Sequence, residues 1–131
     1  MTEAAPVVLL IEDDESLCRI VGRYLRSRGY QVAVAASAEA AEETLRQGVR
    51  PDLILLDLNL PGDTGWDFVR SGAIAAAGSP PVVIASATAV SPKRLTEFGV
   101  AGYLPKPFPL ETLVATVERL TDPEKTGPSD D

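Results

Sequence analysis

The sequence contains no histidine and a single cysteine, Cys18, among its 131 residues. One cysteine excludes an intrachain disulfide, and the scarcity of thiol and imidazole groups argues against a zinc site, which prefers those ligands. The N-terminus, MTEAAP, lacks the basic and apolar segments of a secretory signal, and no apolar run approaches the length that spans a bilayer. The sequence therefore predicts a soluble protein of the cytoplasm, with no membrane partner.

Basic residues are also scarce, since 12 Lys and Arg stand against 19 Asp and Glu and give a net charge of -7. Nucleic-acid backbones and anionic membranes attract clustered Lys and Arg, so neither is expected as the main partner. Bound cations or basic ligands fit this charge better. A chain of this length is expected to form one domain that buries roughly two thirds of its unfolded surface.

Short apolar runs bounded by turn residues predict five strands. They lie at residues 7–11, 32–35, 53–56, 82–85 and 103–104. The run at 53–56 is uninterrupted, as in a strand buried on both faces, and it ends on a carboxylate, Asp57. The run at 32–35 alternates valine with alanine and is the least hydrophobic, which favours the edge of a sheet.

Segments with helical spacing alternate with these strands. The first carries an apolar stripe of Leu17, Ile20, Val21, Tyr24 and Leu25, with Arg19, Arg23 and Arg26 on the opposite face. Capping residues bound the others: Ser37 and Gly48 enclose the second, Ser91 with Pro92 and Gly99 the fourth, and the fifth runs from Pro109 to near Leu120. The third, at 66–77, is interrupted by Gly72, which costs on the order of 1 kcal/mol in a helix interior.

Five alternations of strand and helix predict an α/β fold with a parallel sheet covered on both faces. We expect a doubly wound, flavodoxin-like three-layer sandwich with strand order 2-1-3-4-5. The domain is predicted to span residues 1–121. Residues 122–131 are polar and rich in Pro, Gly and Asp, so they are interpreted as a disordered tail or a truncated linker.

In this strand order, ligands bind beyond the carboxyl ends of the strands. That edge collects Glu12 and Asp13 after the first strand, Asp57 after the third, Ser86 after the fourth and Lys106 after the fifth. Three carboxylates in one crevice repel one another and need a cation. Hard oxygen ligands favour Mg²⁺, which commonly binds through one or two carboxylates and a phosphate oxygen.

Asp57 beside such a metal is a candidate nucleophile toward phosphorus, carrying an acyl phosphate. Lys106 is then predicted to supply a second positive charge, and the Ser86 hydroxyl a hydrogen bond to a phosphoryl oxygen.

Four segments resemble, in order and spacing, the receiver domain of the response regulator family of two-component signalling. They are LLIEDDES, PDLILLDLNLPG, PVVIASA and YLPKPF, within a resemblance that covers about residues 7–120. The resemblance implies that Asp57 is the phosphoacceptor and Asp13 a direct Mg²⁺ ligand. It also implies that Glu12 acts through metal-bound water and that Asn59 contributes its backbone carbonyl.

The same resemblance implies that Ser86 and Tyr103 switch when Asp57 is modified, and that Lys106 binds the phosphoryl group and precedes a cis peptide bond to Pro107. The expected partners are a sensor histidine kinase or histidine phosphotransfer protein and a downstream output protein or domain. The expected role is that of a regulator rather than an enzyme. Thr88 and Asn59 occupy positions that tune the lifetime of the acyl phosphate, and the segment from Ser86 to Lys106 is shorter than usual.

Other functions stay open on the residues alone. A phosphorylation-independent interaction module of the same fold predicts a missing acid, serine or lysine, and none is missing. A haloacid dehalogenase-type enzyme wants a second Asp two residues after the nucleophile, where this chain has Asn59. A flavodoxin-like cofactor site wants a hydroxyl-rich phosphate loop, whereas EDDES repels phosphate. Trp66 is interpreted as packing, Cys18 as a small hydrophobe and Asp14 as a helix cap.

Overall fold

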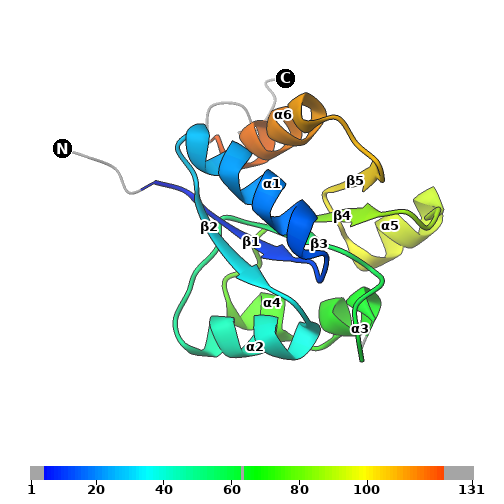
Figure 1. The fold of residues 1–131 in the computed structure, drawn as a ribbon. Helices are drawn as coiled ribbons and strands as arrows, with labels where there is room; N and C mark the ends of the chain where they lie inside the picture. The colour runs from blue at the N-terminus through cyan, green and yellow to red at the C-terminus, as the bar shows by residue number, and fades with distance from the viewer. Residues whose placement is uncertain (1–4, 63, 123–131) are drawn as a thin grey trace, which may run out of the picture.

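A computed structural model of the protein describes residues 5–62 and 64–122. The strands are β1 (Val7–Ile11), β2 (Gln31–Ala35), β3 (Leu53–Leu56), β4 (Val82–Ser86) and β5 (Gly102–Pro105). They form one sheet in the order β2-β1-β3-β4-β5, and every neighbouring pair is parallel (Figure 1). The predicted strand order and the edge position of β2 are confirmed.

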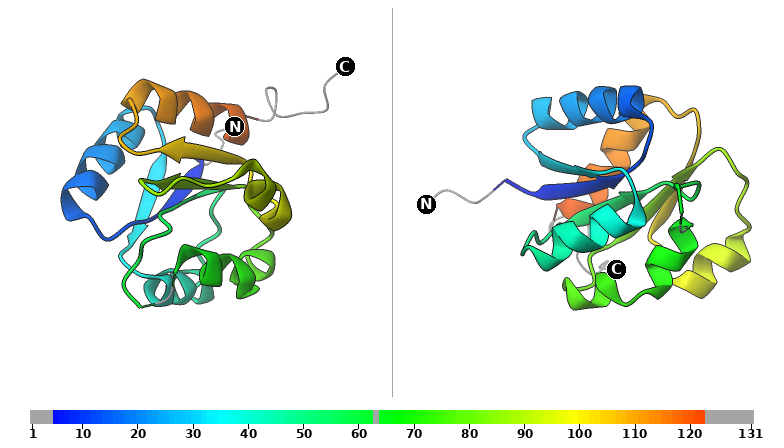
Figure 2. Two further views of the ribbon diagram at one scale, coloured as in Figure 1. Left: turned by 90° about the vertical axis from the view of Figure 1, so that its right-hand side faces the viewer. Right: turned by 60° about the horizontal axis from the view of Figure 1, so that its bottom comes forward.

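The helices are α1 (Glu15–Ser27), α2 (Ala38–Arg46), α3 (Gly65–Arg70), α4 (Ala73–Ala76), α5 (Pro92–Phe98) and α6 (Leu110–Thr121). Helices α1 and α6 cover one face of the sheet, and α2, α3 and α4 cover the other (Figures 1 and 2). Alternate strand residues point to opposite faces, so each face has its own core. Leu9, Ile54 and Ile84 pack with α2 and α3, whereas Leu10, Leu55 and Val83 pack with α1 and α6.

Side chains cap the starts of α1, α2 and α5 as the sequence predicts, whereas no side chain caps the start of α6 at Pro109. The carboxylate of Asp14 accepts a hydrogen bond from the Leu17 amide, and the Ser37 hydroxyl accepts one from Ala40. Ser91 does the same for the Arg94 amide at the start of α5, which ends at Gly99 in the left-handed conformation. These bonds satisfy amide groups that have no partner within their own helix.

The segment predicted as one helix at 66–77 is divided into α3 and α4. Gly72 adopts φ +88°, a left-handed conformation that glycine reaches at little cost, and no side chain caps α4. The Ser71 hydroxyl donates to the Phe68 carbonyl just before the break. The prediction of one helix over this segment was therefore wrong, and the helix divides at the glycine that interrupts the sequence pattern.

The described chain ends just after α6, so the tail predicted for residues 122–131 lies outside the described residues except for Asp122. Among the helices in the described ranges, none is long and apolar enough to cross a membrane.

Candidate functional site

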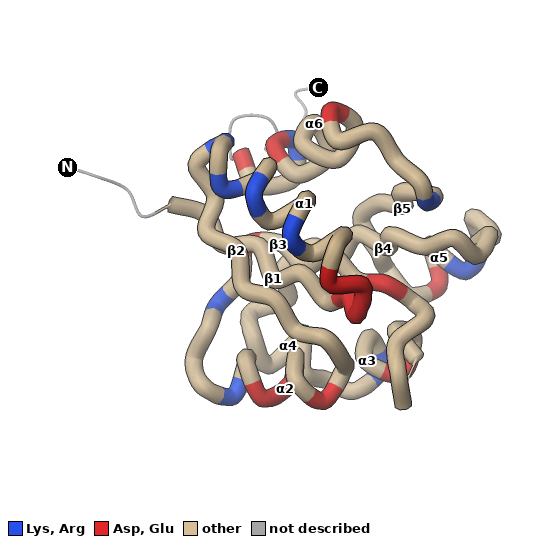
Figure 3. The backbone as a smooth tube through the Cα atoms, in the orientation of Figure 1, with Lys and Arg blue, Asp and Glu red and all other residues tan. Residues whose placement is uncertain are grey.

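Three carboxylates meet at the carboxyl edge of the sheet, where β1 and β3 are neighbours. Glu12 and Asp13 follow β1, Asp57 follows β3, and one oxygen from each lies within 4.8 Å of the others. Glu12 and Asp57 are only 3% and 5% exposed, whereas Asp13 faces solvent. Figure 3 shows this concentration of acidic residues where β1 runs into α1. The site thus has a buried acidic floor, formed by Glu12 and Asp57, and a solvent-accessible acid at its edge, Asp13.

Lys106 brings a positive charge to this floor from the segment that follows β5. Its Nζ atom lies 2.7 Å from Glu12 Oε1 and 3.4 Å from Asp57 Oδ2. Burial acts to lower the pKa of Lys106, but the hydrogen bond and charge of Glu12, together with Asp57, outweigh burial and raise it. The ammonium group therefore stays charged at neutral pH and can offset negative charge at Asp57.

Burial itself acts on the pKa of Glu12 in the opposite direction from its action on Lys106, because burial favours the neutral form and a neutral carboxyl is protonated. Burial raises the pKa of the Glu12 carboxyl, and the hydrogen bonds from Lys106 and from the Asp14 amide act against that rise.

Nearby, burial and the charges of Glu12, Asp14 and Asp13 raise the pKa of Cys18 to about 11, so this thiol stays protonated at neutral pH. Cys18 behaves as a small half-buried side chain, as predicted.

The backbone around Asp57 is tightly held. Its amide donates to the Ile11 carbonyl, and its Oδ1 atom accepts a hydrogen bond from the Asn59 amide at 3.1 Å. Gly65 lies against the same backbone, because a Cβ atom there would stand 2.7 Å from the Asp57 carbonyl oxygen and 2.9 Å from the Leu58 Cα atom. The carboxylate is therefore presented from a rigid strand end.

Thr88 connects the residues beside the acidic floor. Its amide donates to Ser86 Oγ at 3.0 Å, and its hydroxyl accepts a hydrogen bond from the Asn59 side chain at 3.2 Å. The Tyr103 hydroxyl donates to the Thr88 carbonyl at 3.0 Å. Ser86 is fully buried. Hydrogen bonds thus join Ser86, Asn59 and Tyr103, all three singled out in the sequence, through Thr88.

The donor set fits a hard divalent cation. Carboxylate oxygens from Glu12, Asp13 and Asp57 are close enough to share one ion, and they suit Mg²⁺ better than a soft metal. Two of the three acids are buried, which makes their mutual repulsion costly without a cation. The backbone carbonyl of Asn59 remains a predicted ligand.

The structure brings Glu12, Asp13, Asp57 and Lys106 together. It joins Asn59 to Asp57 by a hydrogen bond and links Ser86 and Tyr103 to Asn59 through Thr88. The Lys106–Pro107 peptide bond is cis as expected. Sequence reasoning missed Gly65, whose role is visible only from its contact with the Asp57 backbone. It also missed the capping box of Thr64 and Asp67 at the start of α3, although a Thr three residues before an acid was a readable signal.

Comparison with known proteins agrees with this arrangement. The family model of the response regulator receiver domain matches residues 8–118. The DNA-binding response regulator MtrA of Mycobacterium tuberculosis is 38% identical over 111 residues, which cover 84% of this chain and 48% of MtrA. The chain spans about half the length of the curated relatives it matches.

Solved structures show the same likeness. The non-phosphorylated HemR receiver domain from Leptospira biflexa is 33% identical with a TM-score of 0.78, and the match covers 89% of this chain and 94% of that one. The chemotaxis protein CheY4 of Vibrio cholerae is 31% identical with a TM-score of 0.80, and the match covers 89% and 99% of the two chains.

Proposed function

Because the chain belongs to the receiver-domain family of response regulators, we propose that it is a switch in which Asp57 accepts a phosphoryl group. One observation carries this proposal. The buried Asp57 carboxylate lies within 4.8 Å of two further acids and 3.4 Å from the Lys106 ammonium group. A lone strand-end acid needs neither a metal-binding set nor a cationic partner, whereas a phosphoacceptor needs both.

In the proposed transfer, an Asp57 oxygen attacks phosphorus on a partner phosphohistidine and forms an acyl phosphate. The phosphorus–nitrogen bond breaks, and the imidazole nitrogen keeps the electron pair and takes up a proton. Lys106 holds positive charge beside the phosphoryl oxygens, and Ser86 donates its hydroxyl hydrogen to one of them. In the later hydrolysis, water attacks phosphorus, inorganic phosphate leaves and the Asp57 carboxylate is regenerated.

Glu12, Asp13, Asp57 and the Asn59 carbonyl are the residues proposed to hold Mg²⁺ at this site. When bound, the ion supplies positive charge that offsets the charge of the phosphoryl oxygens. The three carboxylates contribute oxygen ligands from two neighbouring strand ends, which fixes their relative positions before any phosphoryl donor arrives.

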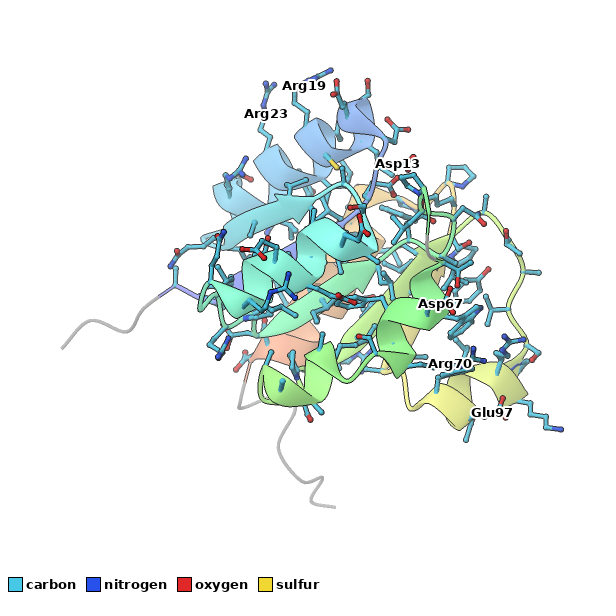
Figure 4. All side chains as sticks on the ribbon, turned by 90° about the horizontal axis from the view of Figure 1, so that it is seen from below. Asp13, Arg19, Arg23, Asp67, Arg70 and Glu97 are labelled. Atoms are coloured by element: carbon cyan, nitrogen blue, oxygen red, sulfur yellow. The ribbon has the colours of Figure 1, made fainter. Side chains whose placement is uncertain are left out.

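We further propose that the phosphohistidine partner docks on α1 beside the site. A cavity of about 410 Å³ lies there, lined by apolar side chains of α1 and of the segment after β5 and by Lys106. Ile20, in its wall, is 52% exposed, and Arg19 and Arg23 project from the same helix (Figure 4). An apolar surface bordered by arginines suits a helical partner that carries acidic residues. We propose that this partner meets the regulator in the cytoplasm.

The remaining parts of the assignment are proposals as well. Residues 1–121 are proposed to form the receiver domain, with 122–131 as a polar tail or the start of a linker. Since the chain matches about half of its curated relatives, the output is proposed to come from a further domain or a separate protein. The role is that of a regulator that assists its own phosphorylation and dephosphorylation.

Intact mass after incubation with acetyl phosphate and Mg²⁺ tests the central proposal. The wild-type protein should gain one phosphoryl group, and Asp57→Asn should gain none. Asp52→Asn is a matched control, because Asp52 is an exposed acid near the opposite end of β3 that accepts a hydrogen bond from the Val7 amide. Equal gains in Asp57→Asn and the wild type would exclude Asp57 as the acceptor.

A further inference from the structure

Helix α5 lies at the end of the molecule beyond β4, next to α3, and it is attached by side chains at its surface (Figures 1 and 2). None of the described residues of α5 is buried. Leu95 packs at the margin of the core, and Phe98 stacks on Trp66 of α3 with ring centroids 4.6 Å apart and planes inclined by 28°. The aromatic pair is therefore a principal attachment of α5.

Two guanidinium groups enclose this pair from different elements. Arg94 of α5 lies 5.1 Å from the Trp66 ring and 5.5 Å from the Phe98 ring, and Arg70 of α3 lies 5.0 Å from the Phe98 ring. Figure 4 shows Asp67 and Arg70 of α3 on the same side of the molecule as Glu97 of α5. We name the set of Trp66, Arg70, Arg94 and Phe98 the aromatic clamp.

The clamp is continuous with the backbone that carries Asp57. Trp66 directly follows Gly65, whose amide donates to the Leu58 carbonyl at 3.0 Å and where an added Cβ atom would stand 2.7 Å from the Asp57 carbonyl oxygen. The chain has no room there for even one added carbon atom. Because this contact is closely packed, we expect a shift of the backbone at Asp57 toward Gly65 to move the first turn of α3, and Trp66 with it.

We propose that the aromatic clamp makes α5 move together with α3, so that a change at Asp57 reaches α5 through Gly65 and Trp66. This route is separate from the hydrogen bonds that join Ser86, Thr88 and Tyr103. It rests on the proposed phosphorylation of Asp57 for its stimulus, but the anchoring of α5 does not. The structure gives the route two testable parts, which are the anchor itself and its response.

Hydrogen exchange of the α5 amides tests the anchor without phosphorylation. Phe98→Leu keeps an apolar side chain but removes the stack and the ring under both guanidinium groups, so α5 exchange should rise by about tenfold. Arg94→Ala should give a smaller rise. Lys93→Ala, which removes the neighbouring exposed positive charge on α5, should leave exchange unchanged. Equal α5 exchange in Phe98→Leu and the wild type would overturn the proposal.

Phosphorylation with acetyl phosphate, followed by intact mass, tests the response. In the wild type, the emission of Trp66, the only tryptophan, and the exchange of α5 should both change once one phosphoryl group is gained. Phe98→Leu should gain the same mass without the change in α5 exchange. An equal response in Phe98→Leu, or full mass gain with no response in the wild type, would overturn the coupling. Absence of mass gain in the wild type would instead overturn the proposed function and the coupling with it, while the exchange experiment would still decide the anchor.

Discussion

At the scale of single residues, the position of Asp57 depends on a neighbour that carries no functional group. Gly65 allows the start of α3 to touch the backbone of Asp57 and Leu58, and a side chain there would have to displace backbone atoms rather than a flexible side chain. Backbone in a packed interior yields little, so even a methyl group strains the site. Gly65 is thus a positioning residue for Asp57.

We expect Gly65→Ala to lower the free energy of unfolding by about 1–3 kcal/mol and to slow phosphoryl gain from acetyl phosphate. Urea denaturation measures the first effect and time-resolved intact mass the second. Gly22→Ala in α1 is the matched control, because its Cβ atom would meet only the end of the Arg26 side chain, at 3.2 Å. Alanine is also the better helix former, so the control should be neutral or stabilising. Equal stability and labelling rates in the two variants would contradict the argument.

Several single residues of the site were predictable because a topological rule places them. Glu12, Asp13, Asp57, Ser86 and Lys106 all follow strands, and the carboxyl ends of parallel strands share one edge. The pairing of Lys106 with Glu12 at 2.7 Å was not predicted. Strand order brings these two side chains to one edge, but their distance depends on rotamers and on the course of the segment after β5.

At the scale of elements, the strands, their order and the helix caps were predictable, whereas side-chain contacts between distant helices were not. All five strands and the caps of α1, α2 and α5 follow from short stretches of sequence, since runs and capping residues act within a few positions. The stack of Trp66 on Phe98 joins residues 32 positions apart, and nothing local to either residue marks it. The sequence marked Gly72 as a weak position within one helix. It did not show that the helix divides there, because the division depends on the left-handed backbone that Gly72 adopts.

Helix α1 carries the element-scale prediction about partners. Ile20→Glu should slow phosphoryl transfer from a histidine kinase by about tenfold or more, because it places a charge in the apolar centre of the proposed docking surface. The probe is the autophosphorylated histidine kinase that transfers fastest to the wild type. Labelling by acetyl phosphate should be unchanged, because a small donor needs no docking surface.

Val34→Glu is the control for this test, since Val34 is 46% exposed on β2 at the edge of the sheet. It should transfer like the wild type in both assays. If Ile20→Glu and Val34→Glu behave alike with the kinase, the docking surface lies elsewhere.

At the scale of the whole molecule, the acidic site and the net charge of -7 both add electrostatic repulsion to the folded state. Folding collects Glu12, Asp13 and Asp57 within 4.8 Å, while Lys106 provides a single positive charge among them. The folded state therefore keeps a local excess of negative charge that an extended chain disperses. A cation that binds only the folded state must stabilise it.

Magnesium is accordingly expected to raise the stability of the whole domain. At a concentration of ten times its Kd, a ligand specific for the folded state adds about 1.4 kcal/mol to the free energy of unfolding. For a domain of this size that amounts to a rise in Tm of several degrees, measurable by calorimetry and reversible with a chelator.

Asp13→Asn separates this effect from general screening of the acidic surface. The variant keeps the size of the exposed side chain and removes one charged ligand, so it should lose most of the magnesium-dependent rise while still responding to sodium chloride as the wild type does. Sodium chloride at matched ionic strength should raise the wild-type Tm less than magnesium, because bulk salt screens dispersed charges but does not occupy the pocket. Equal rises with the two salts, or an undiminished magnesium effect in Asp13→Asn, would show that the three acids do not act as one cation site.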